Sequence, residues 1–292
     1  MTELILQTCL NALVASSYTA LFAVGLVLIF GIMKVVNFAH GELYMVGAYA
    51  VWYLFAVQGL PFPVAVLGGT VIACLIGMVM ERFMFRPMRS NPLGGLIMSV
   101  GMLFVLQVGA VMFGGVGRSK QVPSMIHGAF NLFGIEGVTV QYQRLIVIIS
   151  SVVILAAFWL FMKKTRTGWA LRACAQDQEA AALQGININR MSMLAVTLGA
   201  GLAGISGALM APLVPVVPLM GHSVIVTTFI VIIVGGIGSL EGAVVAAVLY
   251  SFFHTVVTTM ADGVLASILG LLLMMAVLVV KPTGIFGTAE KV

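Results

Sequence analysis

Charged residues are scarce in this sequence of 292 residues. Asp, Glu, Lys and Arg together supply 8% of the chain, whereas an ordinary soluble domain contains about 25%. Apolar residues supply 61%. This composition excludes a soluble globular enzyme and a disordered chain. It also excludes nucleic-acid binding, because the 14 basic residues are scattered between apolar runs and cannot line a phosphate backbone.

The sequence also lacks the patterns of disulfide frameworks, metal sites and nucleotide sites. Its three cysteines, Cys9, Cys74 and Cys174, are far apart and form no CxxC pair, so we expect neither a disulfide nor a bound metal. The phosphate-binding pattern G-x-x-x-x-G-K-[ST] is missing, so any ATP hydrolysis must occur in another subunit. The four histidines lie in different segments, and we assign no catalytic residue.

Apolar runs of membrane-crossing length fill the chain. A helical span needs roughly 20 mostly apolar residues, and eight or nine such runs with short loops account for the whole length. The sequence therefore predicts an all-α, polytopic transmembrane helical bundle, embedded in membrane lipid, that forms one domain over residues 1–292. The predicted segments are Leu10–Met33, Leu43–Gln58, Phe62–Met80, Leu93–Gly114, Leu145–Met162, Met191–Pro212, Ser223–Gly238, Ala243–Met260 and Val264–Val280.

Two basic loops set the predicted topology. The first is RFMFRPMRSNP after Met80, and the second lies within residues 163–190. The positive-inside rule places both loops in the cytoplasm. The stretch Lys34–Glu42 leaves two alternatives. It is either a cytoplasmic loop, which gives nine spans, or a break near the membrane centre that merges two segments and gives eight. We favour the break.

The motif NFAHGE carries the polar residues of that break: Asn37, His40, Gly41 and Glu42. A helix broken inside hydrocarbon needs partners for its freed backbone groups. Asn37 and His40 can supply hydrogen bonds, and Gly41 permits a bend. The helix that restarts there would present its N–H groups to an electron-rich ligand group such as a carboxylate. The alternative is an interfacial turn with His40 exposed to water.

A second glycine-rich break, GGIGSLEG, spans Gly235–Gly242. It interrupts Ile233–Tyr250 much as the first break interrupts Val35–Ala50. Matching interruptions in two halves of a chain indicate a transport site. We therefore predict an internal pseudo-repeat and place Gly238 and Gly242 in the translocation path. The alternative is a simple packing hinge.

Small residues recur every four positions in GAGLAGISGAL, at Gly199, Ala203 and Gly207. This spacing predicts a face on which helix backbones approach closely. The sequence leaves open whether that face packs within the chain or against a partner.

The segment Thr165–Arg190 is too polar to span a membrane. Strong helix formers at Ala173–Leu183, followed by Gly185, predict a short helix exposed to the cytoplasm.

Four motifs follow one another along almost the whole chain, at Gly25–Tyr49, Glu81–Arg89, Ala173–Asn187 and Ile233–Ala243. Together they resemble LivH-type permeases, the membrane subunits of bacterial branched-chain amino acid ABC importers. The resemblance implies a multi-pass permease of the bacterial inner (plasma) membrane that is not itself an enzyme and holds no cofactor. It also implies four partners: a second, LivM-like permease subunit, two cytoplasmic ATPase subunits that bind ATP and Mg²⁺, and a periplasmic substrate-binding protein.

The resemblance also assigns roles to single residues. It places a coupling helix, which enters a cleft on an ATPase, at Glu179, Ala180, Ala181 and Gly185. It places near the translocation path Asn37, His40, Gly41, Gly238 and Gly242. Glu42 follows Gly41 in the NFAHGE motif, and we include it in the path.

The solute and one rival class remain open at this point. A branched-chain amino acid is the expected solute, but the same family scaffold serves urea, short amides and small carboxylates. The rival is a self-sufficient channel or an ion-coupled secondary transporter. A carrier of that kind would need an acid within the membrane, for which the candidates are Glu42, Glu241 and Asp262.

Overall fold

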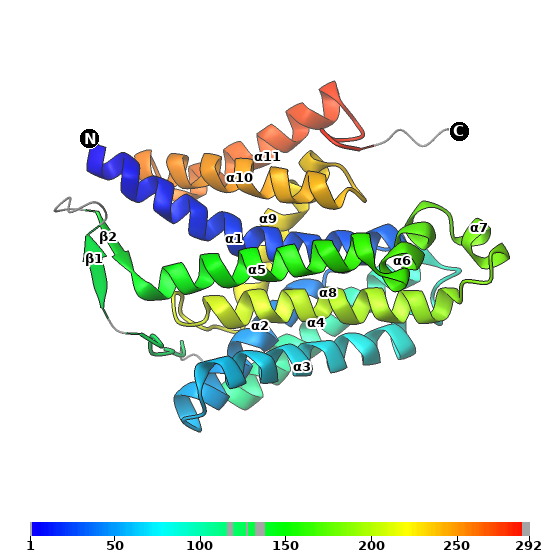
Figure 1. The fold of residues 1–292 in the computed structure, drawn as a ribbon, viewed down its shortest axis with the longest axis horizontal. Helices are drawn as coiled ribbons and strands as arrows, with labels where there is room; N and C mark the ends of the chain where they lie inside the picture. Colours follow the sequence, from blue (N-terminus) through cyan, green and yellow to red (C-terminus); the bar gives the residue numbers. More distant parts are fainter. Residues whose placement is uncertain (1, 116–118, 127, 132–137, 288–292) are drawn as a thin grey trace.

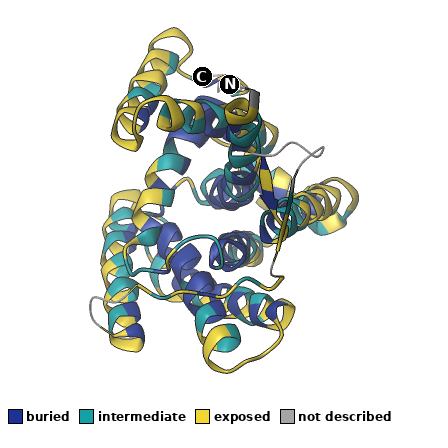
Figure 2. Cartoon of the chain, turned by 90° about the vertical axis from the view of Figure 1, so that its left-hand side faces the viewer, coloured by how far each residue is buried: buried dark blue, intermediate teal, exposed yellow. Residues whose placement is uncertain are grey.

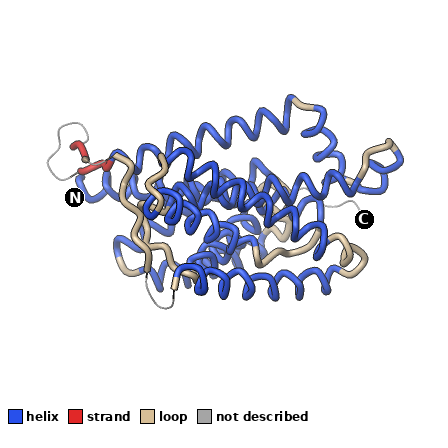
Figure 3. Tube along the Cα trace, turned by 90° about the horizontal axis from the view of Figure 1, so that it is seen from below, coloured by secondary structure: helices blue, strands red, loops and turns tan. Residues whose placement is uncertain are grey.

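The computed structural model describes residues 2–115, 119–126, 128–131 and 138–287. These residues form a bundle of helices with a small β-ribbon at one end (Figures 1 and 3). Strands β1 (Ala129–Asn131) and β2 (Thr139–Gln141) pair antiparallel. The helices are α1 (Thr2–Met33), α2 (His40–Val51), α3 (Phe62–Met80), α4 (Pro92–Gly114), α5 (Tyr142–Lys164), α6 (Arg166–Gln176), α7 (Gln178–Leu183), α8 (Ile188–Met210), α9 (Met220–Gly235), α10 (Leu240–Met260) and α11 (Gly263–Val280), with π-helical turns η1 (Trp52–Val57) and η2 (Glu81–Phe85).

Seven of the described helices are long and apolar enough to cross a membrane: α1, α3 with η2, α4, α5, α8, α10 and α11. Helices α1 and α8 are mostly buried inside the bundle, whereas only a small part of α4, α5 and α11 is buried. Figure 2 shows the buried residues gathered on the central helices and the exposed ones at the periphery. Lipid is as apolar as these exposed side chains. The predicted all-α transmembrane bundle is confirmed.

Polar residues begin the helices at the positions where the apolar runs start. The side chains of Asn91, Asp177, Asn187, Ser239 and Asp262 each accept a hydrogen bond from a backbone N–H in the first turn of α4, α7, α8, α10 and α11. Such caps satisfy donors that a helix start leaves free, and each contributes about 1 kcal/mol. The segment boundaries are therefore encoded locally.

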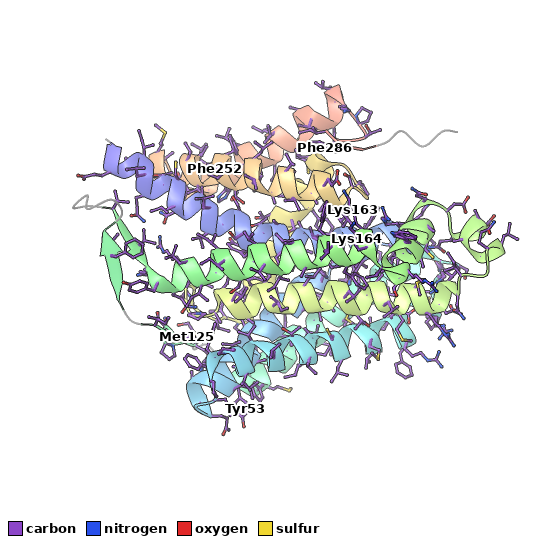
Figure 4. The ribbon with its side chains drawn as sticks, in the orientation of Figure 1. Tyr53, Met125, Lys163, Lys164, Phe252 and Phe286 are labelled. Carbon is purple, nitrogen blue, oxygen red and sulfur yellow. The ribbon has the colours of Figure 1, made fainter. Side chains whose placement is uncertain are left out.

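The two ends of the bundle differ in charge. Helices α6 and α7 project from one end (Figure 1), where Lys163 and Lys164 close α5 (Figure 4). At the same end Arg89 donates a 2.7 Å hydrogen bond to Asn189. We call this the basic end, and the positive-inside rule places it in the cytoplasm. The opposite end, with the β-ribbon and the start of α1, is the outer end.

The chain doubles back inside the membrane after α1. Helix α1 reaches the basic end, where the Ile32 carbonyl accepts a hydrogen bond from Gln178 at the start of α7. Helix α2 nevertheless begins deep inside the bundle, because the ring of His40 lies 4.6 Å from that of Phe22. Residues 34–39 thus return from the basic end to the interior.

This geometry confirms the predicted break but not the predicted merging of two segments into one crossing. After the break, α2 runs to the outer end, where Trp52 follows it and the Lys120 ammonium lies 5.0 Å from the Trp52 ring. Seven helices are long and apolar enough to cross a membrane, and α2 and α9 are shorter helices that each follow an irregular segment. If these two combined segments also cross, the chain has the nine spans of the first alternative. Composition alone does not encode this reversal.

Helix α1 packs along α10 as α8 packs along α3, and α2 and α9 meet at their first turns through Gly41 and Gly221. Helices α1 and α8 run in opposite directions. These contacts are compatible with two halves of opposite orientation, although α2 packs much more extensively on α8 than α9 does on α1. The internal pseudo-repeat, which pairs Val35–Ala50 with Ile233–Tyr250, stays a prediction.

The small-residue face of α8 packs within the chain. Gly199 lies against Gly25 of α1, Gly204 against Ala73 of α3, and Gly207 against Tyr44 of α2. Helix α8 thus joins the two halves, which holds the short helix α2 in the centre of the bundle.

Candidate functional site

The polar residues of the break lie together in the centre of the bundle. Asn37 is 1% exposed, and His40 and Glu42 are fully buried. The backbone N–H of Phe38 donates a 3.2 Å hydrogen bond to the Ser99 hydroxyl, which fastens the irregular segment to α4. The alternative of a water-exposed His40 at an interfacial turn is thereby excluded.

Glu42 is held from the neighbouring helix. Its Oε1 accepts a 2.9 Å hydrogen bond from Gln107 Nε2 of α4, while Oε2 has no partner among the described residues. In the sequence Gln107 is one polar residue within an apolar run. Its pairing with Glu42 joins positions 65 residues apart, and no local signal reports such a contact.

Asn37 and His40 keep unused hydrogen-bonding capacity. Within the described chain, neither the amide of Asn37 nor the ring nitrogens of His40 make a side-chain hydrogen bond. Buried polar groups in native proteins nearly always have a partner in protein or water. Polar side chains at membrane depth also mark solute and ion pathways. The arrangement therefore leaves hydrogen-bonding groups that water or a polar solute could use.

Gly41 has a different role from the predicted bend. A Cβ atom at Gly41 would overlap the backbone carbonyl of Gly221, so this glycine permits α2 and α9 to cross. The residue with a left-handed conformation is Lys34, with φ 52°, at the end of α1. The two shorter helices thus begin side by side. The start of α2 is buried, whereas at the start of α9 Leu219, His222 and Ser223 are exposed.

Gly238 and Gly242 lie elsewhere. Gly238 is exposed in the turn between α9 and α10 with φ +91°, and Gly242 packs against Gly235 across that turn. Glu241 beside them lies 3.6 Å from Lys163, which places the turn at the basic end. No described contact joins these glycines to the break residues, so the structure does not bring the two predicted groups together.

The predicted coupling segment projects from the basic end as α6 and α7 (Figure 1). Glu179 and Ala180 are exposed, whereas Ala181 is buried. Gly185 has φ +82° and open space around it, which fits a helix stop. Sequence reasoning missed Leu183, which ends α7 with 87% of its surface exposed. An apolar residue in an otherwise polar loop was the pattern that could have indicated this exposed position.

The coupling segment rests on elements that lead to the central site. Besides the hydrogen bond from Gln178 to Ile32, Ala175 lies against Gly31 in the last turn of α1. That turn directly precedes the irregular segment that carries Asn37. Helices α6 and α7 are therefore in direct contact with the end of α1 that leads into the break.

A second link joins the two basic loops. The Arg89 guanidinium lies 3.3 Å from the carboxylate of buried Glu81 and also donates to Asn189 at the start of α8. The first basic loop is thus tied to the start of α8, which follows the coupling segment in the chain. Among the described residues, no group of three or more His, Cys, Asp or Glu side chains is placed to hold a metal ion.

Comparison with known proteins gives consistent matches. The family model of the branched-chain amino acid transport system permease component matches residues 8–280. The chain is 32% identical to the high-affinity branched-chain amino acid transport system permease protein BraD of Pseudomonas aeruginosa, over 98% of this chain and 96% of BraD. It is 31% identical to LivH of Escherichia coli, with the same two coverages. A probable LivH of Methanocaldococcus jannaschii is 25% identical over 96% of this chain and 92% of that protein.

Proposed function

This chain belongs to the family of branched-chain amino acid transport system permease components, and from that premise we propose that it carries a branched-chain or other small amino acid across the bilayer. It is a permease subunit of an ABC importer and a multi-pass protein of the inner membrane. The observation that carries the proposal is the buried polar break, where α2 and α9 begin side by side at Asn37, His40 and Glu42. Urea, short amides and small carboxylates are the other solutes to be tested.

The break supplies the groups that a polar solute needs in hydrocarbon. Asn37 offers an amide donor and acceptor, His40 a ring nitrogen of each kind when neutral, and Glu42 an acceptor oxygen. The starts of α2 and α9 add backbone dipoles that favour a carboxylate. Inverted repeats with broken helices and a site between them are typical of alternating-access transporters. The site is closed in this structure, and it would open when the two halves move against each other.

The driving force comes from partner subunits. Two cytoplasmic ATPases bind ATP and Mg²⁺, a second, LivM-like permease pairs with this chain, and a periplasmic binding protein delivers the solute. Glu179, Ala180 and Gly185 contact one ATPase, with Leu183 seated in its cleft, while buried Ala181 packs α7 onto the rest of this chain. The contacts of Gln178 with Ile32 and of Ala175 with Gly31 pass the movement to α1 and the break. Gly238 and Gly242 act at the basic exit of the path.

Gentle purification of the tagged chain from its own membrane tests this assembly. We expect mass spectrometry to find two ATPase subunits and a second permease, and proteoliposomes of the complex to take up leucine only with ATP and the binding protein. Under conditions that preserve other membrane complexes, recovery of the chain alone or as a homo-oligomer would contradict the proposal. It would support a self-sufficient channel or carrier.

Cysteine accessibility tests the path. In a background lacking Cys9, Cys74 and Cys174, cysteines placed at Asn37 and His40 should react slowly at rest, because both positions are at most 1% exposed. During turnover they should react with small water-soluble thiol reagents at least tenfold faster. Reaction rates with and without ATP measure this difference.

A matched control is Ser151→Cys, which is equally buried but lies on α5, a peripheral helix that carries none of the break residues. It should stay protected in every transport state. Complete protection of the Asn37 and His40 positions in every state would remove the break from the path.

A further inference from the structure

A second polar cavity opens at the outer end. It has a volume of about 480 Å³ and lies between α1, the start of α5 and the end of α8. This volume is in the usual range for small-molecule sites. Its polar wall consists of Asn11, Tyr18, Ser124, Gln141 and Arg144. Its apolar wall includes Met210, Leu213 and Val214.

Arg144 provides the charge in this cavity. Its guanidinium donates a hydrogen bond to the side-chain oxygen of Asn11. No acidic side chain is among the described residues that line the cavity. A guanidinium carries five N–H donors in a planar fork, and a carboxylate is the anion that matches this fork with two parallel hydrogen bonds. The Asn11 contact leaves donors for such an anion.

The position of the cavity relates it to the central site. Tyr18 lines the cavity, and its ring lies 6.5 Å from that of Tyr44. The Tyr44 ring lies 5.9 Å from Phe22, which in turn lies 4.6 Å from His40. A layer of three aromatic rings thus separates the outer cavity from the buried break.

We propose that this cavity is an outer binding site for an α-amino acid on its way to the break. Arg144 holds the carboxylate, the side-chain oxygens of Gln141 and Ser124 accept from the ammonium group, and the apolar wall contacts the aliphatic side chain. The aromatic layer closes the site inward until the halves move. This assignment rests on the proposed function, because it requires the solute to be an amino acid.

An acidic side chain of the binding protein is the other source of a carboxylate. The volume of the cavity and the presence of both polar and apolar side chains in its lining favour the free amino acid. A side chain that only docks would need the charge and not the apolar wall.

The closing experiment measures equilibrium binding of radiolabelled leucine to the complex in nanodiscs without the binding protein. Wild-type complex should bind leucine, and leucinamide, which lacks the carboxylate, should compete poorly. Arg144→Gln should weaken leucine binding about tenfold or more, as expected for loss of charge-assisted hydrogen bonds. It should also abolish the preference over leucinamide. Arg144→Lys should restore part of the affinity.

Two further variants control for misfolding and for charge. Asn11→Asp keeps Arg144 but places a carboxylate beside it, so leucine binding should fall while the complex stays assembled. Lys120→Gln removes a positive charge of the outer end that lies over Trp52, outside the cavity. That variant should bind leucine normally.

The outcomes separate this inference from the proposed function. If Arg144→Gln bound leucine as the wild type does, with the same preference for leucine over leucinamide, the cavity assignment would be overturned. The proposed function would still stand if the wild-type complex took up leucine. Loss of binding-protein docking in Arg144→Gln, with leucine binding intact, would assign the carboxylate to the binding protein and overturn it too. If the wild-type complex took up no amino acid, the proposed function itself would fail.

Discussion

Replacing Gly207 with leucine is expected to abolish transport and to prevent the chain from accumulating in folded form. A Cβ atom at Gly207 would overlap the backbone carbonyl of Tyr44, where α2 crosses α8. A backbone atom cannot rotate away, so the two helices would have to separate. Overpacking by side chains typically costs about 1–3 kcal/mol, and separation would also remove close backbone packing between membrane helices. Thermal unfolding and leucine uptake of the complex measure the effect.

Gly101→Leu in α4 is the matched control. Nothing lies within 4 Å of a Cβ atom at Gly101, and the residue is exposed on a peripheral helix. The same substitution there should leave the melting temperature within a few degrees and uptake near that of the wild type. A Gly207→Leu complex with normal melting temperature and uptake would refute the packing assigned to α8.

Replacing Leu183 with glutamate is expected to lower ATP-driven uptake at least tenfold, because the complex loses its ATPase. Leu183 is 87% exposed at the tip of α7, and burying a leucine side chain is worth about 1.5–3 kcal/mol. A charge in its place would have to be desolvated at the interface. Glu179→Arg in the same helix should act in the same direction. Co-purification of the ATPases and uptake measure both.

Gln176→Glu controls for the added charge, because Gln176 is exposed in α6 of the same segment. It should leave assembly intact.

Two substitutions at Gly185 distinguish an effect of backbone strain from an effect of an added side chain. Gly185→Val should weaken coupling more than Gly185→Asn, because asparagine tolerates the left-handed conformation that φ +82° requires. Normal ATPase recovery and uptake with both Leu183→Glu and Glu179→Arg would remove the coupling assignment.

The sequence predicted which residues form the central site, but it did not predict how these residues are packed. Asn37, His40 and Glu42 stand out because polar residues interrupt an apolar run. Their burial, and the bond from Gln107 to Glu42, depend on how α2 packs against α4. The glycine pair Gly238 and Gly242 matched the same pattern, yet it forms a turn at the basic end. A glycine-rich segment has the same composition whether it forms a break inside the bundle or a turn at its end, so composition cannot distinguish the two.

The amino-acid sequence by itself determined the class of protein, the apolar segments, the helix starts and the cytoplasmic side. Each of these depends on residues close together in the chain: an apolar run, a capping side chain such as Asp177 or Ser239, a cluster of basic residues. The tertiary structure alone decided that the chain doubles back after α1, that α2 pairs with α9, and that Arg144 meets Asn11 across the outer cavity. These contacts join residues far apart in the chain. The crossing of α2 and α9 depends on close backbone approach at Gly41 and Gly221, and the Arg144 contact depends on how α5 packs beside α1.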